Sequence, residues 1–233
     1  MAKKFKVKKS FTPWGRFIRG ICRVVKKKPA LINLNDTGVP PCSIMIGNHN
    51  GAGGPFNFRT FLHTYCMTWG AHQMTEGFLS RYRYLNKIFY RRKLGYGPIK
   101  SFLFSIGFGI FSPLPYSVAG TIPVYYDNRV YKTFDYSMQC LQQNVPVMVF
   151  PEDSDAGYQE IIDRFHGGFL MLSKMYYRKH GVDLPIYTPR FNTKPKQIVI
   201  GKPMYYNEMA KTKTDQEILD IFRNYMNDLK DTI

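Results

Sequence analysis

Short apolar runs alternate along the chain with longer segments in which apolar residues recur at helical spacing. Each short run has the length and the bounding turns that are typical of a buried strand. We predict strands over residues 43–47, 121–126, 145–150, 184–187 and 197–200. The segments with helical spacing predict helices over residues 56–67, 77–92, 130–143 and 167–179. This alternation predicts a single α/β domain with a mixed, largely parallel sheet flanked by helices.

The pattern predicts a further helix near the C-terminus. Thr214 and Glu217 have the spacing of a capping box, in which the two side chains bond the backbone N–H groups at the start of a helix. One apolar face then follows at helical spacing, made of Ile218, Ile221, Phe222, Tyr225 and Leu229.

The N-terminal segment predicts an amphipathic helix that starts with Thr12 as N-cap and Pro13 as first helical residue. Its apolar face consists of Phe11, Trp14, Phe17, Ile18, Ile21, Cys22, Val24 and Val25. Its basic face consists of Arg16, Arg19, Arg23, Lys26 and Lys27. A helix of this kind lies in the interface of an anionic membrane, so we expect residues 10–28 to bind such a surface. The alternative is a helix whose apolar face packs on its own protein.

Charge supports a polyanionic partner. The chain carries a net charge of +17, and this charge is concentrated in two zones. Residues 1–30 hold 11 Lys and Arg, residues 77–126 hold seven more, and neither zone contains Asp or Glu. Either lipid or nucleic acid would fit such zones. We expect no nucleic-acid partner, because no recognition motif is present and the Trp/Phe/Ile face fits lipid better.

The chain of 233 residues is long enough for one sizeable core. We therefore expect a basic membrane-associating segment over residues 1–30 and one α/β domain over residues 31–233. The longest apolar stretch, residues 102–115, is too short to cross a bilayer, and it is a re-entrant segment, an interfacial segment or buried core. The four cysteines form no CxxC pair, which fits a cytosolic compartment. The expected location is peripheral, at the cytoplasmic face of the membrane.

Polar clusters directly follow three of the predicted strands. The first contains Asn48 and His49 and continues into a turn with Gly51, Gly53 and Gly54. The second follows the strand 121–126 and ends at Arg129. The third follows a buried strand and runs Phe150-Pro151-Glu152-Asp153-Ser154-Asp155. Because sites in parallel sheets form at the carboxyl ends of strands, we expect these clusters to form a site.

The order and spacing of these clusters, with Leu184-Pro185-Ile186-Tyr187-Thr188-Pro189 as a fourth, resemble the four blocks of the glycerolipid (lysophosphatidate-type) acyltransferase family. The resemblance covers roughly residues 40–205. It implies a fold like that of glycerol-3-phosphate acyltransferases. It also implies transfer of an acyl group from acyl-CoA or acyl carrier protein, as co-substrate, to a lipid acceptor. No metal or tightly bound cofactor is expected.

The resemblance also assigns roles to residues. His49 is the general base, with Asn48 beside it in the catalytic pair. Glu152 contacts the acceptor, and Arg129, Asp153 and Ser154 belong to the substrate site. In the turn of Gly51, Gly53 and Gly54, backbone N–H groups are candidate donors to the oxyanion of the reaction.

Three departures from the family pattern bear on function. Gly54 stands where the family has the Asp that orients the histidine, and Tyr126 stands where it has an Arg. In the third block, Asp153-Ser154-Asp155 replaces Gly-Thr-Arg, which disfavours a phosphate-bearing acceptor and favours a hydroxyl or an amine.

Several alternatives follow from the missing Asp. Another carboxylate orients His49, or a backbone carbonyl does, or the chain is a catalytically impaired scaffold that binds lipid or acyl chains. The candidate carboxylates are Glu76, Asp127, Glu152 and Asp153.

Overall fold

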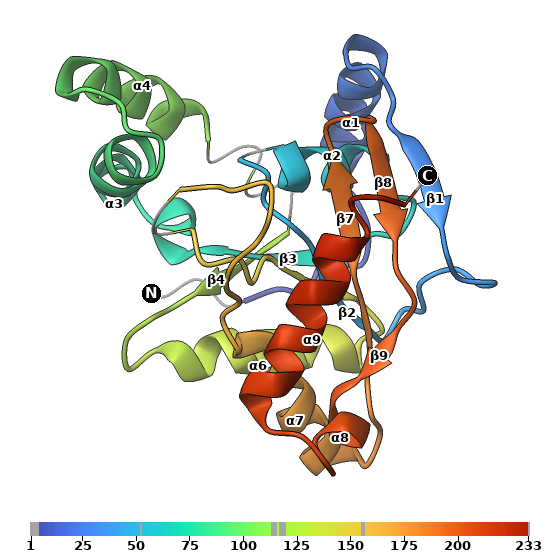
Figure 1. The fold of residues 1–233 in the computed structure, drawn as a ribbon. Coiled ribbons are helices and arrows are strands. Elements are labelled where there is room, and N and C mark those ends of the chain that lie inside the picture. The colour runs from blue at the N-terminus through green and yellow to red at the C-terminus, as the bar shows by residue number, and fades with distance from the viewer. Residues whose placement is uncertain (1–4, 52, 113–115, 117–119, 155–156, 233) are drawn as a thin grey trace.

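A computed structural model describes residues 5–51, 53–112, 116, 120–154 and 157–232. It has a mixed α/β architecture with a six-stranded sheet flanked by helices, which confirms the predicted class (Figure 1). The first five strands in the sheet order are parallel to one another, and the last is antiparallel to its neighbour. This order is β4 (Thr121–Val124), β3 (Met67–Ala71), β5 (Val147–Val149), β2 (Ile44–Ile46), β6 (Pro185–Tyr187) and β9 (Met204–Tyr205).

A second, three-stranded sheet lies against the first. It contains β8 (Gln197–Ile200) between β1 (Ala30–Asn33), which is parallel to it, and β7 (Pro189–Asn192), which is antiparallel. All five predicted strands are present, four of them shorter than expected. The pattern missed β1, β3, β7 and β9. In β7 the reason is clear, because Arg190 and Asn192 are polar and yet fully buried.

The large sheet is buried on both faces. In β2, Ile44 and Ile46 point into a core shared with helices, and Met45 points to the opposite face. The first core includes residues of α6 (Val130–Gln142), α7 (Gly168–His180) and α9 (Asp215–Asp228). The second includes residues of α2 (Gly53–Phe61) and the small sheet. Near-continuous apolar strands are what such double burial requires.

The predicted helices are largely confirmed. Thr214 and Glu217 form the capping box of α9, and a short helix, α8 (Tyr206–Met209), precedes it. The helix predicted over 56–67 is wrong at its end, because α2 stops at Phe61 and β3 begins at Met67. The carbonyls of Thr60 and Leu62 are bound there by arginine side chains from another helix.

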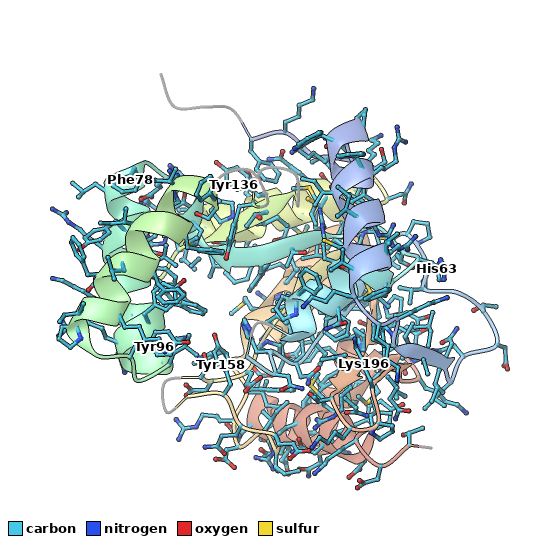
Figure 2. All side chains as sticks on the ribbon, turned by 90° about the horizontal axis from the view of Figure 1, so that it is seen from above. His63, Phe78, Tyr96, Tyr136, Tyr158 and Lys196 are labelled. Carbon is cyan, nitrogen blue, oxygen red and sulfur yellow. The ribbon has the colours of Figure 1, made fainter. Side chains whose placement is uncertain are left out.

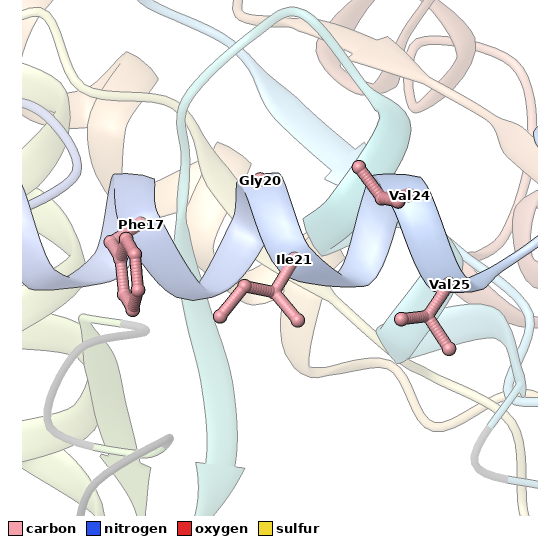
Figure 3. Close-up of a pocket in the computed structure, with 5 residues that line it drawn as sticks. All are labelled: Phe17, Gly20, Ile21, Val24 and Val25. Carbon is pink, nitrogen blue, oxygen red and sulfur yellow. The ribbon is translucent and has the colours of Figure 1, made fainter.

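That other helix is α1 (Pro13–Val25), which is capped by Thr12 as predicted. The side chains of Arg19 and Arg23 both donate to the carbonyl of Thr60, at 2.8 and 2.9 Å. Basic residues therefore dock α1 on the body, and its apolar face points outward. A shallow hollow on this face is lined by Phe17, Gly20, Ile21, Val24 and Val25 (Figure 3). Five residues of the apolar face are exposed, whereas Phe11, Ile18 and Cys22 are half-buried, so most of this face does not pack on its own protein.

Residues 78–111 form a helical hairpin beyond β3. A short 3-10 helix (His72–Thr75) leads into α3 (Phe78–Tyr84), the π-helix η2 (Leu85–Lys93) and α4 (Pro98–Phe111). A small cluster with Met74, Leu85 and Tyr90 at its centre joins the hairpin to the sheet. Residues 102–111 belong to α4, while residues 113–115 lie outside the described part. No helix in the described ranges has the length and apolar character that crossing a bilayer requires.

Candidate active site

The turn after β2 begins with Asn48, whose buried side chain joins the two sheets. Its amide nitrogen donates to the carbonyl of Phe191 at 3.0 Å, and its amide oxygen accepts from the N–H of Phe191 at 2.8 Å. Phe191 lies in β7, so this pair pins the end of β2 to the small sheet. Because both ends of the amide are engaged, the structure supports a positioning role for Asn48 in fixing the backbone next to His49.

The turn then reverses tightly into α2. Asn50 and Gly51 have positive φ angles of 42° and 65°, a conformation that glycine adopts readily. The N–H of Gly53 donates to the carbonyl of Asn50, and the N–H of Gly54 donates to the carbonyl of His49. Two of the amides predicted as oxyanion donors are therefore used within the turn.

Gly54 lies very close to the backbone carbonyl groups of Asn48 and His49. A Cβ added at this position would lie 1.9 Å from the carbonyl oxygen of Asn48 and 2.9 Å from that of His49. Neither oxygen can move without disrupting the turn. Position 54 therefore has no room for any side chain, which explains the absence of the expected Asp in physical terms.

The backbone supplies the orienting group for His49. Its Nδ1 lies 3.2 Å from the carbonyl oxygen of Gly51. Because a carbonyl only accepts, the neutral imidazole carries its proton on Nδ1, and Nε2 keeps its lone pair. The sequence left open whether a carboxylate or a backbone carbonyl orients His49, and the structure shows the backbone carbonyl of Gly51 in this position. None of the described residues hydrogen-bonds Nε2.

The imidazole of His49 contacts two aromatic side chains. Its ring centroid is 5.0 Å from those of Phe150 and Tyr158. The pKa of His49 is lowered to about 4, mainly by burial and to a smaller extent by the positive charge of Lys93, while the bond to Gly51 acts in the opposite direction. The ring is therefore neutral at pH 7 and able to accept a proton.

Glu152 follows β5, and its side chain binds the backbone of His49. Its buried carboxylate accepts a hydrogen bond from the backbone N–H of His49 at 3.0 Å and another from the backbone N–H of Gln159. Burial raises its pKa, and these two bonds act against that rise. Its role toward an acceptor stays a prediction, and the structure shows it holding two loops together.

Lys93 reaches the site from the hairpin. Its Nζ donates to Oγ of the buried Ser154 at 2.6 Å and lies 5.9 Å from the ring centroid of Tyr158. Tyr158 also hydrogen-bonds Ser154, and burial raises its pKa to about 12. Tyr158 lies beside the hairpin that carries Tyr96 (Figure 2). Sequence reasoning missed Lys93, because only the path of η2 brings it to the strand ends.

Arg129 lies in a separate cluster at the end of β4. It pairs with Asp127 at 2.7 Å and with Glu76 at 3.4 Å, and it stacks on Tyr125. Two strands, β3 and β5, separate β4 from β2, which corresponds to roughly 14 Å at the usual spacing. The structure thus does not bring Arg129 and His49 into contact.

Of the other predicted residues in the third block, Asp153 faces the following segment, 3.9 Å from Arg164 and from His166. Asp155 lies outside the described residues, so the argument about acceptor charge that rests on it stays an expectation.

Arg190 holds the loop after Ser154 in place. Its guanidinium is fully buried and donates to the carbonyl of Glu160 at 2.8 Å, to that of Met226 at 2.9 Å and to the side chain of Asn192 at 2.9 Å. Three separate segments therefore meet at one side chain. Sequence reasoning did not single out Arg190, because a lone Arg in a strand has no distinguishing signal.

The site thus offers a neutral imidazole, a neighbouring ammonium group and two aromatic side chains at the carboxyl end of a parallel sheet. Among the described residues, no group of three or more His, Cys, Asp or Glu is placed to hold a metal ion. Comparison with protein-family models, with curated proteins and with solved structures finds no match for the chain.

We predict that Gly54→Asp destabilises the fold rather than supplying an orienting carboxylate. The new side chain would collide with two backbone oxygens, and overpacking of this kind costs about 3 kcal/mol. Chemical denaturation measures the loss. Gly38→Asp is the matched control, because position 38 has open space around it and should change stability by less than about 0.5 kcal/mol. Equal stability of the two variants would contradict the model of the turn.

We predict that His49 titrates near pH 4, since burial disfavours its charged form. NMR titration of the histidine ring signals, assigned with His49→Ala, measures this pKa directly. Above about pH 5 the ring should be neutral. Lys93→Met should raise the pKa, because it removes a nearby positive charge, whereas Lys87→Met on the exposed side of the same helix should not. A value near 6.5 would mean that His49 is solvated.

Proposed function

We propose that the chain is a membrane-surface acyltransferase with a fold like that of glycerol-3-phosphate acyltransferases. It moves an acyl group from acyl-CoA or acyl carrier protein to a hydroxyl, or an amine, of a lipid acceptor. The observation that carries this proposal is the neutral His49, whose Nδ1 lies against the Gly51 carbonyl and whose lone pair at Nε2 has no partner among the described residues. The resemblance to the glycerolipid acyltransferases supports the choice of reaction.

The reaction is a single displacement at the thioester carbonyl. Nε2 of His49 removes the proton of the acceptor hydroxyl as its oxygen attacks the carbonyl carbon. The carbonyl oxygen becomes an oxyanion in the tetrahedral intermediate. The carbon–sulfur bond then breaks, and the thiolate takes the proton back from His49. The products are the acylated lipid and the free thiol of the carrier.

The oxyanion needs a positively charged or N–H donor. The amides of Gly53 and Gly54 are bound within the turn, which leaves Gly51 as the backbone candidate of the three. Lys93 supports a second choice, because its ammonium group lies on Ser154, beside Tyr158 and near enough to lower the pKa of His49. We assign Lys93 to the negative charge that develops on the thioester oxygen.

The membrane partner is supported by α1. Five residues of its apolar face are 49–87 % exposed, namely Trp14, Phe17, Ile21, Val24 and Val25. Burying such side chains in the acyl boundary is favourable, and the surrounding basic residues fit anionic headgroups. The acceptor then reaches the site from the membrane, and the thioester comes from the aqueous side.

Thiol release from acyl-CoA or acyl carrier protein, measured with total membrane lipid as acceptor source, tests the function. We expect acceptor-dependent release by the wild type and none by His49→Ala. Lys93→Met should lower the rate about 10²-fold, as loss of an oxyanion donor does, while Lys87→Met should stay near the wild-type rate. Absence of release with both donors would favour the second candidate, an acyl-binding or lipid-binding scaffold of the same fold.

Binding to vesicles tests the membrane partner. Ile21→Glu places a charge in the apolar face of α1, and we expect it to weaken binding to anionic vesicles about tenfold or more. Val182→Glu is the control, since Val182 is similarly exposed but comes two residues after α7, a helix at the opposite end of the molecule from α1 (Figure 1). Flotation with vesicles of phosphatidylcholine and phosphatidylglycerol measures both. Equal weakening by the two changes would argue against a specific role for α1.

A further inference from the structure

The outer helix of the hairpin, α4, has the reverse of the burial pattern of an ordinary surface helix. It buries Ser101, Ser105 and Gly109 and exposes large apolar side chains. Ile99, Leu103 and Phe111 are 77, 61 and 76 % exposed, and four more residues of the helix are 43–55 % exposed: Phe102, Phe104, Phe108 and Ile110. A helix of a water-soluble protein normally places such residues against the core.

The buried stripe of α4 explains how the hairpin holds together in this orientation. Small residues at every fourth position let the neighbouring helix approach closely. A Cβ added at Gly109 would lie 3.2 Å from the ring of Phe78 in α3. Helix pairs in lipid are built in this way, with small residues between the helices and large apolar residues facing the acyl chains.

The charge around α4 indicates which partner covers it. The zone 77–126 contains seven Lys and Arg and no acidic residue, and several of these side chains are exposed: Arg83, Lys87, Arg91, Arg92 and Lys100. A second copy of the chain would bring the same positive charges face to face. An anionic lipid surface offers acyl chains to the apolar residues and negative headgroups to the basic ones.

The placement of α4 fits the same partner. It lies at the same end of the molecule as α1, and the two helices are well separated from each other (Figures 1 and 2). Its 14 residues span about 21 Å, less than the roughly 30 Å of a hydrocarbon core. A helix of this length lies in the interface rather than crossing the bilayer.

We propose that α4 is a second membrane-inserting element, which lies in the interface of an anionic bilayer with its Phe, Leu and Ile side chains among the acyl chains. The protein then rests on the membrane at two places, α1 and α4. The hairpin that carries α4 also carries Lys93, so this attachment holds the strand ends with His49 close to the lipid surface. The proposal stands apart from acyl transfer and does not depend on it.

Flotation with vesicles of phosphatidylcholine and phosphatidylglycerol tests the second attachment. We expect Leu103→Glu to weaken binding about tenfold or more, as loss of one large buried side chain does. Because α1 and α4 are distant, Ile21→Glu combined with Leu103→Glu should weaken binding by about the product of the two factors. Val182→Glu is again the control. Thermal unfolding of each variant confirms that it is folded.

A gentler variant gives an independent readout. Leu103→Trp in a Trp14→Phe background keeps an apolar side chain on α4, and Trp69 is the other tryptophan of the chain. Brominated acyl chains in the vesicles should quench the fluorescence of the new tryptophan. Wild-type binding by Leu103→Glu, or no quenching of the new tryptophan beyond that in Trp14→Phe alone, would overturn the proposal.

Two further outcomes separate this proposal from others. If the wild type forms dimers without lipid, and Leu103→Glu is monomeric yet binds vesicles normally, α4 is an interface between copies and the proposal is wrong. His49→Ala should bind vesicles like the wild type. If no variant releases thiol but Leu103→Glu still loses vesicle binding, acyl transfer fails as the function and the membrane attachment stands.

Discussion

The rest of the site depends on a close backbone contact after β2, where Gly54 packs directly against the carbonyl oxygen of Asn48. The contact requires a residue without a side chain, and it lies in the first turn of α2, which begins at Gly53. The turn between β2 and α2 places the carbonyl oxygen of Gly51 3.2 Å from Nδ1 of His49. His49, the base in the proposed reaction, is oriented here by the main chain, where the family that the sequence resembles has a carboxylate. A carbonyl adds less negative charge than a carboxylate, which agrees with a pKa as low as about 4.

Basic side chains attach both α1 and the hairpin to the body of the molecule. Arg19, Arg23 and Lys93 point toward the body, where they bind carbonyl or hydroxyl oxygens and fix the positions of α1 and the hairpin. The apolar faces of α1 and of α4, the outer helix of the hairpin, point away from the body. Charge thus supplies the internal attachment, and apolar surface is left for an external partner. Of these contacts, the one between Lys93 and Ser154 reaches the candidate site.

Much of the fold followed from the sequence, because buried parallel strands and capped helices have strong local patterns. The same holds for the capping box at Thr214 and for the meeting of His49 and Glu152 at one sheet edge. What the sequence did not reveal depends on contacts between distant segments. Lys93 arrives through a π-helix, and Arg190 is buried by three separate pieces of chain. The outward orientation of the apolar side chains of α4 likewise depends on what this helix packs against, which spacing alone does not encode.

The buried Arg190 has a consequence for how the chain folds. Its acceptors Glu160 and Met226 are 30 and 36 residues away in the sequence. The guanidinium keeps its hydration until both segments arrive, since no single one of them satisfies its donors. Moving the loop that carries Tyr158 would take the Glu160 carbonyl away from a guanidinium that the other segments still enclose, and an unsatisfied buried donor of this kind is costly. Arg190 therefore stabilises the position of this loop.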